Sequence, residues 1–148
     1  MEEFKFTLFL TLLGSVIGTL TALFVAYWRT RYTVKSQDLS KRIELLCESV
    51  SKLEELSCQF WNGDDKVSQH YILGYKEKIS LSVEYLENEY SRFPKGAVND
   101  ELKEFFVACT GGDFESLDRK INPQSQRSVL ITGETLQVAL LKIRNSLY

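Results

Sequence analysis

Cysteine and histidine are the first side chains to consider in this sequence for metal binding or nucleophilic chemistry. The chain has three cysteines, Cys47, Cys58 and Cys109, and one histidine, His70. It contains no C-x-x-C pair, although zinc ligands usually come in closely spaced pairs. An odd number of cysteines also argues against a disulfide framework. The spacing therefore predicts cysteines that pack as small apolar side chains, with no metal site.

Other candidates for catalysis also lack partners at a recognisable spacing. His70 could act as a general base, but no serine or cysteine forms a familiar nucleophile motif with it. Glu84, Glu87 and Glu89 lie among polar residues, and a di-iron site would need Glu-x-x-His pairs. The segment 111–113, Gly-Gly-Asp, could bind an anion, but glycine pairs of this kind usually form turns. We expect no catalytic residue, no cofactor and no enzymatic activity.

The strongest pattern in the sequence is an uncharged apolar run from Phe6 to Trp28. The hydrocarbon core of a bilayer is ~30 Å thick, and about 20 helical residues cross it. The slightly acidic start and the absence of an Ala-x-Ala site argue against a cleaved secretory signal. We therefore predict a short extracytoplasmic N-terminus over residues 1–5 and a retained transmembrane helix over residues 6–28.

Aromatic residues lie at the end of the apolar run, and basic residues follow it. Arg29, Arg31 and Lys35 belong to an expected juxtamembrane linker over residues 29–38. Because Lys and Arg remain on the cytoplasmic side, we expect the N-terminus outside and the C-terminal domain inside. The basic residues could also contact anionic lipid headgroups, at ~1 kcal/mol per residue near the surface, but we favour the alternative that they only determine topology. The aromatic residues expected at the interface are Tyr27, Trp28 and Tyr32.

Four small residues recur at every fourth position of the apolar run: Gly14, Gly18, Ala22 and Ala26. Such a stripe lets two membrane helices approach closely. We expect self-association, or pairing with another membrane protein, through this stripe. The open alternative is that glycine and alanine are simply common in membrane helices. Hydrogen bonds across the interface are expected from Thr7, Thr11 and Thr19.

Residues 29–148 are enough for one small domain with its own core and too few for two, and we expect residues 39–148 to form the helical bundle. Acidic residues outnumber basic ones between residues 44 and 104, which argues against a nucleic-acid partner. The only two prolines, Pro94 and Pro123, separate long periodic stretches. We therefore predict an all-α fold in which a single N-terminal transmembrane helix is followed by a cytoplasmic antiparallel helical bundle.

Helix limits follow from caps, glycines and prolines. The first soluble helix is predicted over about residues 36–61, and the second over about residues 66–92 with Asp64 or Asp65 as its cap. A short helix starts at Asn99 or Asp100 and ends at the glycine pair. A further short helix follows with Asp113 as its cap, and the last helix begins at Pro123.

Apolar residues at three- and four-residue steps predict the core. In the last helix Gly133 is expected as a small core position, although a break there with a start at Thr132, or a strand over residues 128–133, stays open. The expected inward residues are Leu39, Ile43, Leu46, Val50, Leu53, Phe60, Tyr71, Ile72, Tyr75, Ile79, Val83, Leu86, Tyr90, Phe93, Leu102, Phe105, Phe106, Cys109, Phe114, Leu117, Ile121, Val129, Gly133, Leu136, Leu140, Ile143 and Leu147, with Leu45, Cys47 and Leu56 widening the first stripe.

The function expected from these patterns is that of a membrane-anchored, non-enzymatic interaction or assembly protein. It would present a helical domain at the cytoplasmic face and oligomerise or pair through its membrane helix. One alternative is a membrane-acting effector of a phage lysis, exclusion or defence system, and a second is a membrane-tethered enzyme with a cryptic site. The apolar run has only threonines and Ser15 as polar residues, which favours the first function over a pore former.

Overall fold

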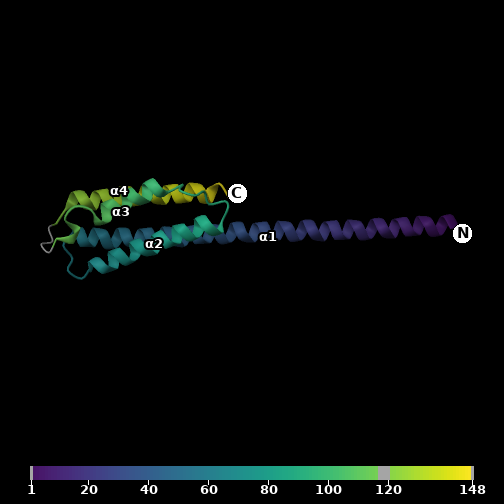
Figure 1. The fold of residues 1–148 in the computed structure, drawn as a ribbon, viewed down its shortest axis with the longest axis horizontal. Coiled ribbons are helices and arrows are strands. Elements are labelled where there is room, and N and C mark those ends of the chain that lie inside the picture. The colour runs from purple at the N-terminus through teal and green to yellow at the C-terminus, as the bar shows by residue number, and fades with distance from the viewer. Residues whose placement is uncertain (1, 117–120, 148) are drawn as a thin grey trace. The chain divides into compact units, whose positions relative to one another are not determined.

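The computed structural model describes residues 2–116 and 121–147 of the chain. These residues form four α-helices and one 3-10 helix, and they contain no strand. The all-helical part of the predicted fold class is therefore confirmed. The elements are α1 (Glu2–Trp61), α2 (Gln69–Glu89), α3 (Asn99–Thr110), η1 (Gly112–Glu115) and α4 (Pro123–Asn145) (Figure 1).

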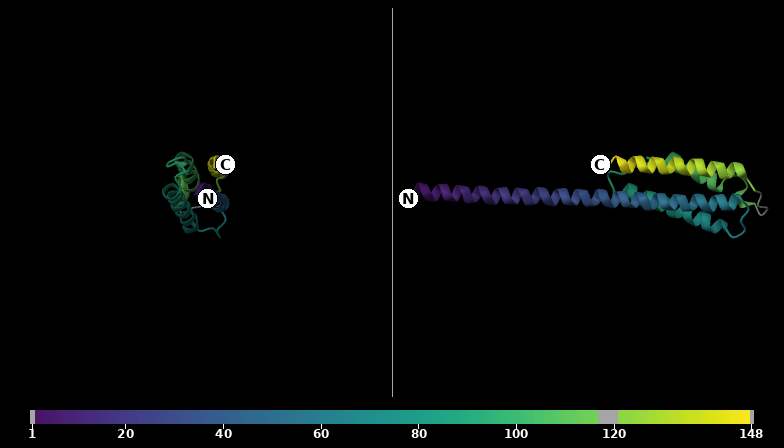
Figure 2. Two further views of the ribbon diagram at one scale, coloured as in Figure 1. Left: turned by 90° about the vertical axis from the view of Figure 1, so that its right-hand side faces the viewer. Right: turned by 180° about the vertical axis from the view of Figure 1, so that it is seen from behind.

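The chain divides into two compact units, Met1–Asp38 and Leu39–Tyr148. The first unit is the N-terminal part of α1. Residues 29–38, expected as a juxtamembrane linker, are helical within it. The second unit contains the C-terminal part of α1 together with α2, α3, η1 and α4. Seen end-on, the helices of this second unit surround a common centre (Figure 2).

One hydrophobic core holds the second unit together. Every helix contributes to this core, because each presents an apolar stripe at three- and four-residue steps. Its fully buried large side chains are Leu39, Ile43, Val50, Leu53, Ile72, Ile79, Leu86, Phe93, Val98, Phe105, Leu136 and Leu140. Except for Val98, the sequence pattern predicted all of these as inward-facing.

Helices α3 and α4 make the closest approach between helices in the second unit, and they lie side by side in Figure 1. Small residues explain this approach. Ala108 of α3 and Ala139 of α4 pack against the core, and Gly133 is buried. A methyl group on Gly133 would come within 3.2 Å of the Phe105 ring, so the absence of a side chain at this position allows the contact.

Two helix starts show how the caps work. Helix α4 begins as predicted, with Pro123 in its first turn and the Asn122 side chain accepting a hydrogen bond from Ser125 N at 3.0 Å. The predicted start of α2 is wrong. Asp64 Oδ1 accepts from Lys66 N at 2.9 Å in a turn, and Ser68 caps the helix by accepting from the backbone N–H of His70.

Helix α4 continues through Gly133 without a break. A helix start at Thr132 and a strand over residues 128–133 are therefore both wrong. Thr132 Oγ1 donates to the carbonyl of Ser128 at 2.8 Å, which satisfies its hydroxyl inside the helix. Core contacts of Val129 and Leu136 on either side outweigh the low helix propensity of a single glycine, about 1 kcal/mol.

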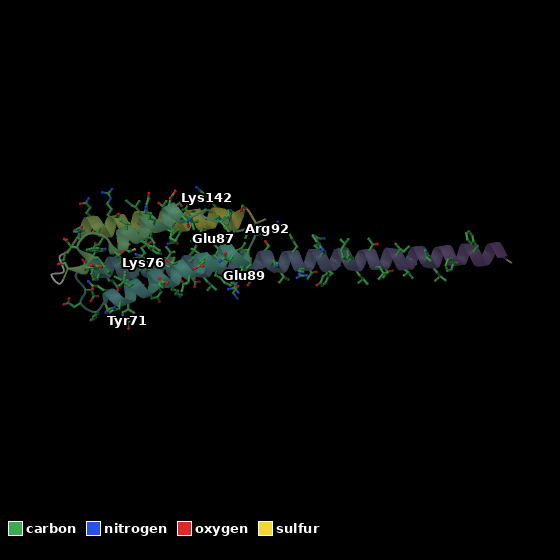
Figure 3. The ribbon with its side chains drawn as sticks, in the orientation of Figure 1. Tyr71, Lys76, Glu87, Glu89, Arg92 and Lys142 are labelled. Atoms are coloured by element: carbon green, nitrogen blue, oxygen red, sulfur yellow. The ribbon has the colours of Figure 1, made fainter. Side chains whose placement is uncertain are left out.

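Several residues differ from the predicted inward pattern. Tyr71 is 64% exposed and points away from the helices in Figure 3, because it lies about 100° around α2 from the buried Ile72. Ile121 is 67% exposed. The expected helix around Phe114 is only the 3-10 turn η1, which ends before Ser116, while Phe114 itself is buried as predicted. The prediction for Leu117 lies outside the described residues.

Candidate membrane and interaction surfaces

Helix α1 contains a stretch long enough and apolar enough to cross a membrane. None of this stretch is buried within the protein. Side chains project from this part of the helix with no other element beside them (Figure 3), and its described leucine, valine, isoleucine and phenylalanine residues are all exposed. A helix that is apolar around its whole circumference needs an apolar environment on every side, and a bilayer is one such environment.

The predicted small-residue stripe lies open on this stretch. Gly14, Gly18, Ala22 and Ala26 are all exposed. A methyl group built on Gly14 or Gly18 would meet no other atom within 4 Å. A larger side chain at either glycine is therefore sterically compatible with a single copy of the chain. Any effect of such a substitution would come from contacts with another molecule.

Threonine hydroxyls along the same stretch are satisfied within the helix. Thr19 Oγ1 donates to the carbonyl of Ser15 at 2.8 Å, and Thr21 does the same to Ile17. Such bonds to the carbonyl four residues earlier remove the need for an external acceptor. The expected role of Thr19 as a donor across an interface thus competes with this bond. The side chains of Thr7 and Thr11 lie outside the described residues.

The residues that follow the apolar stretch are exposed as well. Arg29, Arg31 and Lys35 all lie on the surface of the first unit. The aromatic residues Tyr27 and Trp28 are 62% and 65% exposed just before them. An aromatic band followed by basic residues is the usual arrangement where a membrane helix leaves the bilayer on the cytoplasmic side.

An apolar groove lies between α1 and α2 in the second unit. Its volume is about 730 Å³. Leu46 and Leu86 line it and are almost completely buried, whereas Leu45 and Leu81 line it and are 50% and 56% exposed. The sequence pattern had placed Leu45 in the core stripe. The groove offers apolar surface of the kind that receives an amphipathic helix of a partner.

Gly74 also lines the α1–α2 groove, in the interior of α2. It has helical backbone geometry, and a methyl group built on it would meet no atom within 4 Å. Neither a turn nor a close contact within the chain therefore requires glycine here. A glycine inside a helical pattern is a sequence signal in its own right, but Gly74 was not among the predicted site residues.

A second groove of about 740 Å³ lies between α3 and α4. Its lining combines charged, polar and apolar residues. Asp100, Lys103, Glu104, Val107 and Ala108 come from α3, and Ser125, Ser128 and Thr132 from α4. It extends to the glycine pair, where Gly112 has a φ of 60° and so forms the turn after α3. The charged side chains of this groove are all exposed, which is usual for a solvated surface.

The cysteines lie inside or against the core, as predicted. Burial raises the pKa of the Cys109 thiol to about 12. Burial also raises the pKa of Cys47 and of Cys58. Ser57 lies near enough to Cys109 to oppose its shift slightly, but Ser57 Oγ makes no hydrogen bond of normal geometry among the described residues. Thiols with raised pKa values are poor nucleophiles at neutral pH.

Glu54 of α1 reaches α4 beside the core. Its carboxylate lies against Gly133, where a methyl group would collide with it. Partial burial and, to a smaller extent, the nearby Glu134 raise the pKa of Glu54. The neighbouring Glu55 is exposed and has a lowered pKa, because Lys52 donates a hydrogen bond to it at 2.6 Å. The role of Gly133 as a space for Glu54 was not predicted.

Residues with metal-binding side chains do not gather in the part of the chain that the structure describes. His70 is an exposed residue in the first turn of α2, as expected for a surface position. We found no match between this chain and a known protein family, a curated protein or a solved structure. Function is therefore inferred from the surfaces described above.

Proposed function

We propose that this chain is a membrane-anchored, non-enzymatic interaction or assembly protein. The exposed apolar stretch of α1 would cross the bilayer, and residues 39–148 would form an antiparallel helical bundle. The observation that carries this proposal is the contrast between the two units: one is apolar and exposed on all sides, the other has its own buried core. The first needs lipid, while the second can fold in water.

The proposed topology places the N-terminus outside and the bundle in the cytoplasm. Arg29, Arg31 and Lys35 follow the apolar stretch and are exposed, whereas Lys5 is the only basic residue before it. Retention of Lys and Arg on the cytoplasmic side favours this orientation. The same side chains can then reach anionic headgroups of the inner leaflet.

The anchor would also contribute to assembly. The stripe of Gly14, Gly18, Ala22 and Ala26 is open, so a second copy or another membrane helix can approach it closely. On the cytoplasmic side, the α1–α2 groove supplies apolar surface for a partner. In this proposal the anchor determines location and pairing, and the bundle recruits.

The test is membrane fractionation and protease protection of the full chain with a C-terminal epitope. The protein should stay with the membrane pellet after alkaline carbonate extraction. Its epitope should resist external protease in intact cells and be cleaved after lysis. Release by carbonate would refute the anchor. Cleavage of the epitope in intact cells would refute the topology and leave the anchor in place.

A further inference from the structure

From the outer face of α4, on the side opposite the core, we infer that two copies of this chain pair through their α4 helices. The two helices would lie side by side in opposite directions, related by a twofold axis. This inference goes beyond the proposed function, because the contact lies in the second unit and needs neither the anchor nor the α1–α2 groove. An exposed apolar stripe and two opposite charges within it carry the inference.

Helix α4 is apolar on two faces. Its inner face holds the buried core residues Val129, Leu136 and Leu140. Its outer face holds large aliphatic residues that are 36–56% exposed: Leu130, Ile131, Val138 and Leu141. At about 100° per residue these four lie within an arc of about 100°, and Val138 lies about 200° around the helix from Leu140. Single exposed aliphatic residues are ordinary, but four on one face form an apolar patch of the kind that marks an interaction surface.

Two opposite charges lie on the same outer face. Arg127 and Glu134 are both exposed, and they are seven residues apart, which is about 10.5 Å along the helix axis and nearly two full turns. They therefore lie on the same side of α4, with Leu130 and Ile131 between them along the chain. Neither charge forms an ion pair among the described residues. Covering this face with apolar side chains alone would leave both charges buried without a partner, which is costly.

The outer face is complementary to itself. With the twofold axis between Leu130 and Ile131, Arg127 of each copy lies opposite Glu134 of the other. The same register brings Leu130 against Ile131 of the second copy. Each contact forms twice by symmetry, so the apolar centre is flanked by an ion pair on either side. Contacts that use the same patch on both copies generate twofold dimers, the commonest form of soluble oligomer.

Other arrangements of two α4 helices suit these residues less well. Helices that run in the same direction about a twofold axis would place Arg127 opposite Arg127 and Glu134 opposite Glu134, and like charges that face each other are unfavourable. An axis about one and a half turns further along α4 would set Glu134 against Val138 of the second copy, where the carboxylate would lose water without gaining a partner. The inferred register instead brings Val138 against Pro123, which is exposed in the first turn of α4.

The experiment uses the full chain in detergent solution, where two copies are free to meet in opposite directions. One chain carries a photo-crosslinking amino acid in place of Leu130, and it is mixed with isotopically labelled chain that lacks the probe. Mass spectrometry should locate the adduct between the two chains at residues 127–134 of the labelled chain. The same probe in place of Leu81, which is similarly exposed on α2, should give no adduct with that segment.

Charge reversal in both chains tests the register. With the probe at position 130, Arg127→Glu should lower the adduct yield at least about tenfold, because each new carboxylate faces Glu134 of the other copy. Glu134→Arg should do the same, because two guanidinium groups then face each other on either side. The double variant Arg127→Glu with Glu134→Arg exchanges the charges and should restore the adduct. Lys142→Glu reverses an exposed charge that lies beyond the start of the second copy's α4, and it should leave the yield unchanged.

A mixture of the two single variants separates lost pairing from misfolding. The Arg127→Glu chain carries two acidic groups on its outer face, and the Glu134→Arg chain carries two basic groups. Each should therefore form the adduct with the other and not with itself.

Several results would overturn the inference. An adduct on the α1–α2 groove of the second copy would mean that α4 docks there, and no adduct between copies would leave the outer face to a different protein. A yield that charge reversal does not lower, or that exchange of the charges does not restore, would reject the twofold register. None of these results bears on the proposed function, which membrane fractionation tests separately.

Discussion

Two stretches of the single helix α1 differ in how their apolar residues are distributed around the helix. Residues 12–35 are exposed on every side and apolar through most of their length, with only Ser36 and later residues becoming buried. Residues 39–61 alternate buried positions with exposed polar ones, so that Leu39, Ile43, Leu46, Val50 and Leu53 lie along one buried stripe. The backbone is helical in both stretches, but the arrangement of side chains differs.

This difference teaches that the distribution of apolar residues around a helix, more than their amount, decides what the helix packs against. A uniform distribution leaves no polar face for water and is typical of a membrane span. A stripe can be buried against other helices of the same chain while the opposite face stays solvated. Substitutions at matched residues in the two stretches can therefore break or sharpen the comparison.

The largest effect should come from a leucine of each stretch. Leu53 is 0% exposed and Leu20 is 62% exposed. Leu53→Ala should lower the free energy of unfolding of the second unit by about 2–5 kcal/mol, because it leaves a cavity in the core. Leu20→Ala should change it by less than about 0.5 kcal/mol. Denaturation in detergent, followed by Trp61 fluorescence in a Trp28→Phe background, would measure both; equal effects would refute the distinction.

The next effect compares a glycine of each unit. Gly133 is buried against Glu54 and the Phe105 ring, whereas Gly18 faces open space. Gly133→Leu should destabilise the second unit by about 1–3 kcal/mol through overpacking. Gly18→Leu should leave the same unfolding transition unchanged. A stable Gly133→Leu variant would mean that α3 and α4 can separate without cost.

The proposed association in the membrane should depend on Gly18, although the stability of the second unit should not. Gly18→Leu should weaken pairing of the anchors several-fold, because a bulky side chain separates the two backbones. Val16→Leu, which adds bulk away from the stripe, should have little effect. Crosslinking of full-length protein in membranes measures both variants. Equal crosslinking in Gly18→Leu and the unsubstituted protein would mean that the stripe is only background composition.

Much of the fold followed from local signals. The periodicity of Leu39 to Phe60 and the cap at Asn122 predicted core residues and a helix start, because each depends on neighbours along the chain. Tyr71 was misplaced because it lies at the edge of its stripe, where a small rotation changes burial. Leu45 was misplaced because its exposure depends on how far α2 lies from α1.

The surfaces were less predictable than the helices. Gly14, Gly18, Ala22 and Ala26, and the basic residues Arg29, Arg31 and Lys35, could be identified from the sequence alone, and the structure shows all of them exposed. The α1–α2 groove could not be predicted in this way, because its lining comes from residues roughly thirty positions apart in the chain. The contact of Glu54 with Gly133 joins α1 to α4 and has no local signature either.

The smallest effect concerns two adjacent carboxyl groups in the second stretch of α1. Burial raises the pKa of Glu54 above 4.5, while the hydrogen bond from Lys52 lowers the pKa of Glu55 below it. A raised pKa means that the folded state binds the proton more tightly than the unfolded chain. Glu54 therefore favours folding at low pH, and this contribution is lost as the pH rises through its folded pKa. Glu55 contributes in the opposite sense: its contribution is present above 4.5 and is lost as the pH falls through its folded pKa.

Substitution of each residue by glutamine should show these opposite signs. Near neutral pH, Glu54→Gln should slightly raise the thermal unfolding midpoint, because it removes a charge that is partly buried beside Glu134. Glu55→Gln should slightly lower it, because Lys52 loses its partner. Thermal unfolding at a series of pH values measures both. A lower midpoint in Glu54→Gln would mean that the carboxylate makes a favourable contact at the α1–α4 surface. Packing of the buried stripe of α1 would then depend on a charged residue as well as on its apolar ones, whereas residues 12–28 contain no charged residue.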